Sequence, residues 1–128
     1  EEIRSKVDAN TELVLQPDAE GMKQLMLDAD IAITSGGQTL FELARIGVPS
    51  IIVGISINQK NNINFFKSKL FPFAGWWSDK DLKKNLLLKF KDFENPGLRK
   101  NISRNVKKIV DGKGVNKVVE KIMNHELS

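Results

Sequence analysis

Short apolar runs alternate with longer amphipathic stretches along this chain. Three runs have the length of a strand, at Leu13 to Leu15, Ile31 to Ile33 and Pro49 to Gly54, and Phe73 to Trp77 is a fourth, aromatic run. Apolar runs without polar alternation are typical of parallel strands covered by helices on both faces. Strands that alternate with helices predict an α/β fold: a Rossmann-like parallel sheet of about four strands, flanked by helices and joined by right-handed crossovers.

The stretches between these runs carry apolar residues at the spacing of helices that bury one face. Pro17 with Asp18, and Asn95 with Pro96, are typical helix starts, and another helix is expected to begin at Ser78. The stripes expected to face the core are, helix by helix, Met22, Leu25 and Met26; Ile63, Phe66 and Leu70 of a helix from Asn58 to Leu70; Leu82, Leu86, Leu87 and Phe90; Ile102, Val106, Ile109 and Val110; and Val115, Val118, Val119, Ile122 and Met123.

The helix expected from Thr39 to Ile46 has recognisable signals at both ends. Thr39 and Glu42 have the spacing of a capping box. Gly47 follows the last helical position, and Pro49 comes two residues later, which is a typical helix stop. Spacing leaves Glu42 with two interpretations, because a carboxylate that turns outward instead of capping can accept hydrogen bonds from two vicinal ribose hydroxyls.

Two glycines lie between the Ile31 to Ile33 strand and this helix. Ligands of open α/β sheets bind at the carboxyl ends of the strands, and free N–H groups at a helix start can hold a phosphate. The candidate phosphate-binding residues are therefore Ser35, Gly36, Gly37, Gln38 and Thr39. The alternative is that the glycines serve only a tight turn, and a short Gly-Gly pair leaves the two interpretations about equal.

A second group of polar residues follows the Pro49 to Gly54 strand. Amide side chains both donate and accept, which suits sugar hydroxyls and diphosphates better than acid-base chemistry. The alternative is a polar turn that faces solvent. The amides are Asn58, Gln59, Asn61, Asn62 and Asn64.

Other residue types offer little for catalysis. Trp76 and Trp77 could stack on a ligand ring, but adjacent strand residues face opposite sides, so at least one is expected to pack in the core. No Ser-His-Asp set, cysteine nucleophile or pair of carboxylates stands out, and we expect no catalytic residue. His125 is the only histidine, so neither a zinc site nor another cofactor is expected.

Composition narrows the class of protein. With 128 residues, of which 41% are apolar, residues 1–128 have the size of a single globular domain. No apolar run is long enough to span a membrane, and the lack of cysteine fits a cytoplasmic protein. The net charge of +4 reflects lysines in residues 79–128. Because aromatic residues are not interleaved with these lysines, a solvated helical face is expected rather than a nucleic-acid partner.

Three motifs in the chain match those of a known family. They comprise Ala29, Asp30, Ile33, Ser35, Gly37, Thr39, Glu42, Gly47 and Pro49 of the first motif; Asn58, Gln59 and Asn62 of N-Q-x-x-N; and Asp111, Gly112 and Gly114 of D-G-x-G. In these motifs the chain resembles the C-terminal nucleotide-binding domain of the GT-B, glycosyltransferase family 28-like group. This group includes MurG-type N-acetylglucosaminyltransferases and the UDP-sugar hydrolases of pseudaminic acid synthesis, the PseG and SpsG types. The resemblance runs from about Glu12 to Met123, and its D-G-x-G motif is most similar to the hydrolase branch.

The resemblance implies a UDP-sugar ligand and a role for each group of residues. Ser35, Gly36 and Gly37 would line the diphosphate, and Glu42 would meet the ribose. Gln59 and Asn62, with Asn58 beside them, would reach the sugar or a phosphate.

The same resemblance implies that part of the enzyme is missing. In the hydrolases the catalytic histidine belongs to an N-terminal domain, and the first strand and glycine loop of the C-terminal domain also lie before this segment. We therefore expect a partial GT-B domain from a longer chain, which binds weakly and is inactive alone. The strand at 13–15 would pair with the strand at 31–33 or with a second copy, as a homodimer.

Three functions follow from this comparison. The first is part of a UDP-sugar hydrolase of nonulosonic (pseudaminic or sialic-type) acid synthesis, from a parent similar to CMP-N-acetylneuraminic acid synthetase fusions. The second is the donor-binding half of a MurG-like glycosyltransferase. The third, of another class, is a non-catalytic binding or assembly module whose glycine turn is structural.

Overall fold

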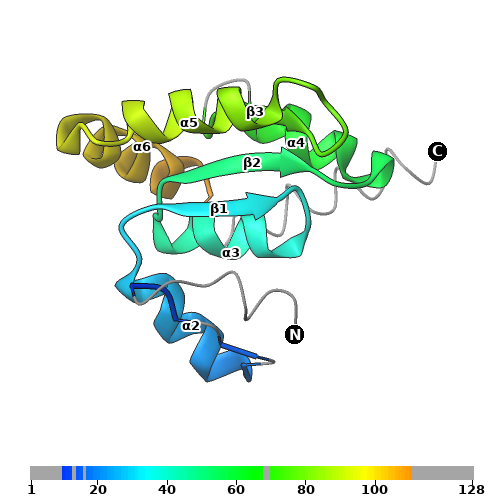
Figure 1. Cartoon of the computed structure of the whole chain (residues 1–128). Coiled ribbons are helices and arrows are strands. Elements are labelled where there is room, and N and C mark those ends of the chain that lie inside the picture. Colours follow the sequence, from blue (N-terminus) through cyan, green and yellow to red (C-terminus); the bar gives the residue numbers. More distant parts are fainter. Residues whose placement is uncertain (1–9, 13, 16, 68–69, 111–128) are drawn as a thin grey trace.

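A computed structural model describes residues 10–12, 14–15, 17–67 and 70–110 of the chain. Three parallel strands form one sheet in the order β1, β2, β3 (Figure 1). This confirms the predicted α/β class. The elements, in chain order, are α2 (Ala19–Asp28), β1 (Ala32–Ser35), α3 (Gln38–Ile46), β2 (Ser50–Gly54), the 3₁₀ turn η1 (Ile57–Gln59), α4 (Lys60–Lys67), β3 (Phe73–Trp76), α5 (Leu82–Asp92) and α6 (Pro96–Ile109).

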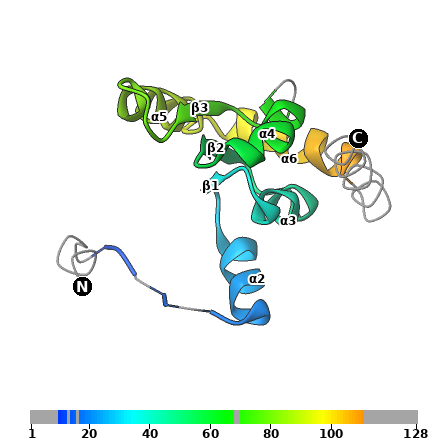
Figure 2. The same ribbon diagram turned by 90° about the vertical axis from the view of Figure 1, so that its right-hand side faces the viewer.

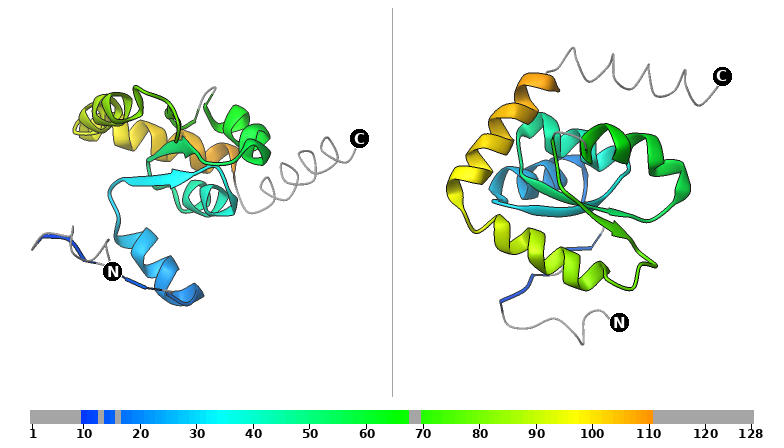
Figure 3. Two further views of the ribbon diagram at one scale, coloured as in Figure 1. Left: turned by 45° about the vertical axis from the view of Figure 1, so that its right-hand side comes forward. Right: turned by 90° about the horizontal axis from the view of Figure 1, so that it is seen from above.

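Helices cover both faces of the sheet. Figure 1 shows α3 on one side of the strands and α5 on the other, and the left-hand view of Figure 3 shows the same arrangement after a turn of 45°. Strand β2 lies in the centre, and its Ile51 and Ile52, which are fully buried, point into opposite layers. This explains why the strand reads as a continuous apolar run, since neither face meets water.

The larger core lies on the side of α3 and α4. Three phenylalanines form its centre, with the ring centroids of Phe41 and Phe66 5.1 Å apart and those of Phe66 and Phe71 5.6 Å apart. The predicted stripe of Ile63, Phe66 and Leu70 is buried here, as expected from its spacing. Aromatic pairs at this separation add to the free energy gained by burial alone.

Helix α6 joins the two layers. Its first half packs Leu98 and Ile102 against the α5 side, whereas Val106 packs against the α3 side. The predicted Asn95 and Pro96 start is confirmed, because the Asn95 side chain accepts hydrogen bonds from the N–H groups of Gly97 (2.8 Å) and Leu98 (3.4 Å). Helix α6 therefore contacts the buried clusters on both faces of the sheet.

Several predicted elements differ from the structure. Val14 and Leu15 are exposed and belong to no strand, so the strand expected at 13–15 is wrong at both described positions, while Leu13 lies outside the described residues. The helix expected from Ser78 starts at Leu82, and its N-cap is Asp81. The helix expected at 115–123 also lies outside the described residues.

Some apolar positions predicted for the core are exposed instead. In α2 only Met26 is buried, against Leu43 and Val48, because the helix meets α3 near one end and extends away from the sheet (Figure 2). Met22 and Leu25 of α2 and Leu87, Phe90 and Ile109 of α5 and α6 have exposed fractions of 37% to 61%. Among the described helices, none combines the length and apolar character required to span a membrane.

Candidate functional site

The three strands end at the same edge of the sheet, because all pair in parallel. The glycine turn, Ser35 to Gly37, follows β1 at this edge, the segment Ile55 to Gln59 follows β2, and Trp77 follows β3. Sequence reasoning put the glycines and the amides at strand ends, and the parallel register brings them together.

Helix α3 begins at this edge without a side-chain cap. Its N-cap is Gly37, and no side chain bonds to the first turn. The capping box predicted from Thr39 and Glu42 is therefore wrong: the helix begins at Gln38, so Glu42 sits beyond the first turn and is too far along to reach back to an N-cap. The N–H of Leu40 donates to the carbonyl oxygen of Gly37 at 3.2 Å, and no side chain caps the start of the helix, where the helix dipole favours negative charge.

Glu42, Gln38 and Thr39 are all exposed on α3. Since the capping interpretation of Glu42 fails, its carboxylate is not committed to the helix start. Of the two interpretations that spacing allowed, only the outward-facing carboxylate is compatible with this helix.

The glycine turn packs directly against η1 and α4. Asn62 donates a hydrogen bond from Nδ2 to the carbonyl oxygen of Gly36, at 3.0 Å. A Cβ atom on Gly36 would lie 2.5 Å from Cγ1 of Ile63 and 3.2 Å from Cβ of Gln59, well inside van der Waals contact. Gly36 is therefore required by the close approach of α4.

Gln59 connects the turn after β2 with the turn after β1. Its Oε1 accepts hydrogen bonds from the N–H groups of Ile55 (3.1 Å) and Ser56 (3.5 Å). Because the oxygen faces these backbone donors, the NH₂ group faces the glycine turn. A Cβ on Gly37 would lie 3.6 Å from Nε2 of Gln59 and 3.8 Å from Oγ of Ser35. An amide donor and a hydroxyl thus border Gly37, next to the open helix start.

The remaining predicted residues are less closely involved. Asn58 and Asn64 are exposed, and Asn61 is half-buried. The expectation for the tryptophans is confirmed: Trp76 packs on Phe73 and over Gly54, while Trp77 is 65% exposed.

The first motif is divided between the two ends of the sheet. Asp30 precedes β1, and Gly47 ends α3 with a left-handed φ of 92°, so both lie at the amino ends of the strands. With Pro49, Arg99 and Ser103 they border a hollow of about 310 Å³. The motif thus combines residues that shape the α3 to β2 connection with residues that could meet a ligand. Asp111, Gly112 and Gly114 lie outside the described residues.

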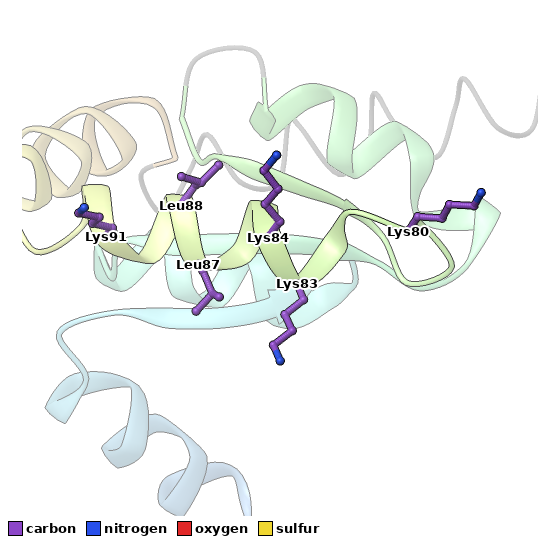
Figure 4. A pocket seen from close by; sticks show the side chains of 6 residues that line it. All are labelled: Lys80, Lys83, Lys84, Leu87, Leu88 and Lys91. Carbon is purple, nitrogen blue, oxygen red and sulfur yellow. The ribbon is translucent and has the colours of Figure 1, made fainter.

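A separate groove of about 520 Å³ runs along α5. Figure 4 shows that its side chains diverge, with Lys83 and Leu87 directed toward β1 and Lys84 and Leu88 directed to the opposite side. Small-molecule sites need polar groups that converge on one point, so we place the candidate site at the glycine turn. In the part of the chain that the structure describes, no group of three or more His, Cys, Asp or Glu side chains is placed to hold a metal ion.

Two exposed apolar residues at the site edge were missed by the sequence reasoning. Ile55 and Ile57 are 51% and 75% exposed, directly after β2. The sequence carries no signal for them, because single exposed apolar residues are common on protein surfaces. They stand out only once the strand bounds are known.

Comparison with known proteins gives two matches. The sequence profile of the glycosyltransferase family 28 C-terminal domain matches residues 2–122. The chain is also 39% identical, over 77 residues, to a pseudaminic acid cytidylyltransferase and UDP-2,4-diacetamido-2,4,6-trideoxy-beta-L-altropyranose hydrolase of Helicobacter pylori. That alignment covers 60% of this chain and 13% of the relative, so the chain spans a small part of the relative's length. No solved structure matches significantly.

Proposed function

This chain belongs to the glycosyltransferase family 28 C-terminal domain family, and from this premise we propose that it is the nucleotide-sugar-binding part of a UDP-sugar hydrolase. The hydrolase would act in pseudaminic or sialic-type acid synthesis. The similarity to a protein named as both a pseudaminic acid cytidylyltransferase and a UDP-sugar hydrolase supports this choice of reaction and a parent of the same fused kind.

The observation that carries the proposal is the convergence at Gly37. The uncapped start of α3, the hydroxyl of Ser35 and the NH₂ group of Gln59 all border this residue. They are donors without a formal charge, which suits a diphosphate held by hydrogen bonds and a helix dipole. Asn62 contributes indirectly, because its bond to the carbonyl of Gly36 fixes the turn.

Each residue then has a role in ligand binding. Ser35 to Thr39 hold the diphosphate. Glu42 accepts hydrogen bonds from the ribose hydroxyls, and Gln59, with Asn58 beside it, faces the sugar side of the diphosphate. No residue is assigned to catalysis, and no cofactor is required.

We further propose that hydrolysis, in which water breaks the bond between sugar C1 and the nucleotide, depends on a catalytic residue from another domain of a longer cytoplasmic protein. The small share of the relative that this chain matches supports such an arrangement. The chain alone would bind UDP weakly and turn over no UDP-sugar.

Isothermal titration with UDP and UMP tests the binding assignment. UDP should bind, even if only in the millimolar range, and more tightly than UMP, since the second phosphate meets the helix start. If neither nucleotide binds this chain while the longer parent protein binds both, the site has been assigned to the wrong residues.

The runner-up function is the donor-binding half of a MurG-like glycosyltransferase, which the family name favours. Both functions use the same site, so the discriminating observation is product formation by the parent protein. Free UDP and released sugar without an acceptor indicate a hydrolase, and UDP formed only with an acceptor indicates a transferase. A non-catalytic assembly module, with the chain pairing as a homodimer, would bind no nucleotide.

A further inference from the structure

The outward side of helix α5 combines lysines with exposed apolar residues. Leu87, Leu88 and Phe90 are 61%, 53% and 47% exposed. At about 3.6 residues per turn, Phe90 lies next to Lys83 around the helix, so lysines and apolar side chains are interleaved on this side. We call this surface the α5 face, and its residues are Lys83, Lys84, Leu87, Leu88, Phe90 and Lys91.

Contacts on the other side of α5 fix the rotation of the helix. Leu82 and Leu86 pack against a buried cluster of the sheet, and Asn85 donates a hydrogen bond from Nδ2 to the carbonyl oxygen of Ala74 at 3.1 Å. The α5 face is therefore turned away from this cluster. The two aspartates of residues 80–92 are the N-cap and the last residue of the helix, so the α5 face between them carries only positive charges.

Helix α6 provides a contrast within the same chain. It has five basic residues and no acidic one, yet Ile109 is its only large apolar residue that is exposed. This is the composition of a basic face that meets water alone. Helix α5 is shorter and exposes three large apolar residues among its lysines. Single exposed apolar residues are common, whereas a cluster of them indicates an interaction surface.

The shape of the α5 face favours a partner that can conform to it. Lys83 and Leu87 are directed to one side of the helix and Lys84 and Leu88 to the other, so the side chains do not enclose a rigid ligand (Figure 4). A lipid surface adapts to such a convex face. Long lysine stems can lie along the apolar region while their ammonium groups stay with the headgroups. Anionic lipids attract lysines near the membrane surface.

We propose that the α5 face binds the surface of an anionic phospholipid membrane, with α5 lying parallel to the membrane plane. Leu87, Leu88 and Phe90 enter the boundary between headgroups and acyl chains, and the lysines contact headgroup phosphates. The glycine turn takes no part in this contact. The inference therefore goes beyond the proposed nucleotide-sugar site and does not depend on it.

Cosedimentation of the full 128-residue chain with vesicles tests the proposal. The chain should bind mixed vesicles of phosphatidylglycerol and phosphatidylcholine in equal parts, and it should not bind vesicles of phosphatidylcholine alone. High salt should weaken the binding, because it screens charges at the membrane surface. Replacement of both Lys83 and Lys84 by glutamine should weaken binding to the mixed vesicles by about 10- to 30-fold. The control replaces the exposed Arg104 and Lys108 of α6 by glutamine and should change the affinity less than about twofold.

A second pair of variants tests the apolar contribution. Leu88→Ser should weaken binding to the mixed vesicles by about three- to tenfold. Its matched control is Leu27→Ser on α2, because Leu27 has the same exposed fraction of 53%, and this variant should bind as the wild type does. Circular dichroism checks that each variant is folded.

Three results would overturn the proposal. The first is that the wild type does not bind the mixed vesicles even at low salt, and the second is that it binds both kinds of vesicle equally. The third is that the lysine variant loses affinity while Leu88→Ser does not. The contact would then be electrostatic alone, as expected for an acidic protein or a nucleic acid, and the apolar residues of the α5 face would not enter a membrane.

Discussion

Substitution of Gly36 by alanine tests how the glycine turn is built. The added Cβ would lie 2.5 Å from Cγ1 and 3.0 Å from Cδ1 of Ile63, and 3.2 Å from Cβ of Gln59. Ile63 is 1% exposed and packed in the larger core, so its side chain has no free space to move into. Overpacking of this kind costs about 1–3 kcal/mol, and the lower entropy of unfolded alanine returns about 0.4–1 kcal/mol.

Taking the middle of each range, about 2 kcal/mol lost and about 0.7 kcal/mol returned, we expect Gly36→Ala to lower the free energy of unfolding by about 1.3 kcal/mol. Urea denaturation followed by circular dichroism measures this change. UDP affinity should fall as well, because α4 and the glycine turn must move apart.

Gly37→Ala is the matched control, since it adds the same atom one residue later. Its Cβ would have ordinary contacts of 3.6 and 3.8 Å, and its φ of −90° is accessible to alanine. The small loss from a poorer N-cap is offset by the unfolded-state entropy, so the change in stability should be near zero. If both variants lose the same stability, or Gly36→Ala loses none, close packing of α4 is not the reason for Gly36.

Three further predictions concern the site and the helix that follows it. Glu42→Asp should keep the free energy of unfolding within about 0.5 kcal/mol of the wild-type value, because Glu42 is exposed and caps no helix. The same variant should weaken UDP binding by about 1–3 kcal/mol. If the wild type binds UDP and deoxy-UDP with equal affinity in titration, Glu42 does not bind the ribose. The carboxylate of Asn62→Asp cannot donate to the carbonyl of Gly36, so the variant should lower the free energy of unfolding, measured by urea denaturation, by about 1–3 kcal/mol. The control Asn64→Asp, at an exposed position, should leave it unchanged. Equal effects of the two variants would exclude the hydrogen bond as the cause. Gly47→Ala should lower the free energy of unfolding by about 1–2 kcal/mol, because Gly47 has a left-handed φ of 92° that alanine rarely adopts. The melting temperature should fall accordingly, and an unchanged melting temperature would contradict this.

The parts of the fold that the sequence predicted well have strong local signals. β2 (Ser50–Gly54) matches the apolar run expected from Pro49, and α3 ends at Gly47, which adopts the left-handed conformation that favours glycine. β1 (Ala32–Ser35) was predicted less well, because it starts one residue later than expected and its Ile33 is 55% exposed rather than covered by helices. The stripe of Ile63, Phe66 and Leu70 matches the core, because all three side chains are buried in one cluster with residues of α3 and β2. In these cases local preference and tertiary packing agree.

The predictions that failed depend on which neighbour an element meets. Leu87 and Phe90 continue the apolar spacing of Leu82 and Leu86, but only Leu82 and Leu86 pack against the buried cluster that includes residues of β2 and β3, whereas Leu87 and Phe90 are 61% and 47% exposed. Apolar spacing predicts which face of a helix is apolar, but it does not predict whether another element packs on that face.

The candidate site was predicted only in outline. Sequence placed the glycines and amides at two strand ends, and the parallel sheet brought them together. The bonds from Asn62 to Gly36 and from Ile55 to Gln59 join segments whose contact no local rule specifies. The capping box failed because Gly37, two residues before the predicted helix, is the N-cap.

The most direct test of the diphosphate site is nuclear magnetic resonance of the ¹⁵N-labelled chain during titration with UDP. If the diphosphate binds at the glycine turn, the largest shifts occur at the backbone amides of Gly36 to Thr39 and at the side-chain amide of Gln59. Shifts that cluster on Lys83 to Lys91 of the α5 groove, or no shifts at millimolar UDP, would contradict it.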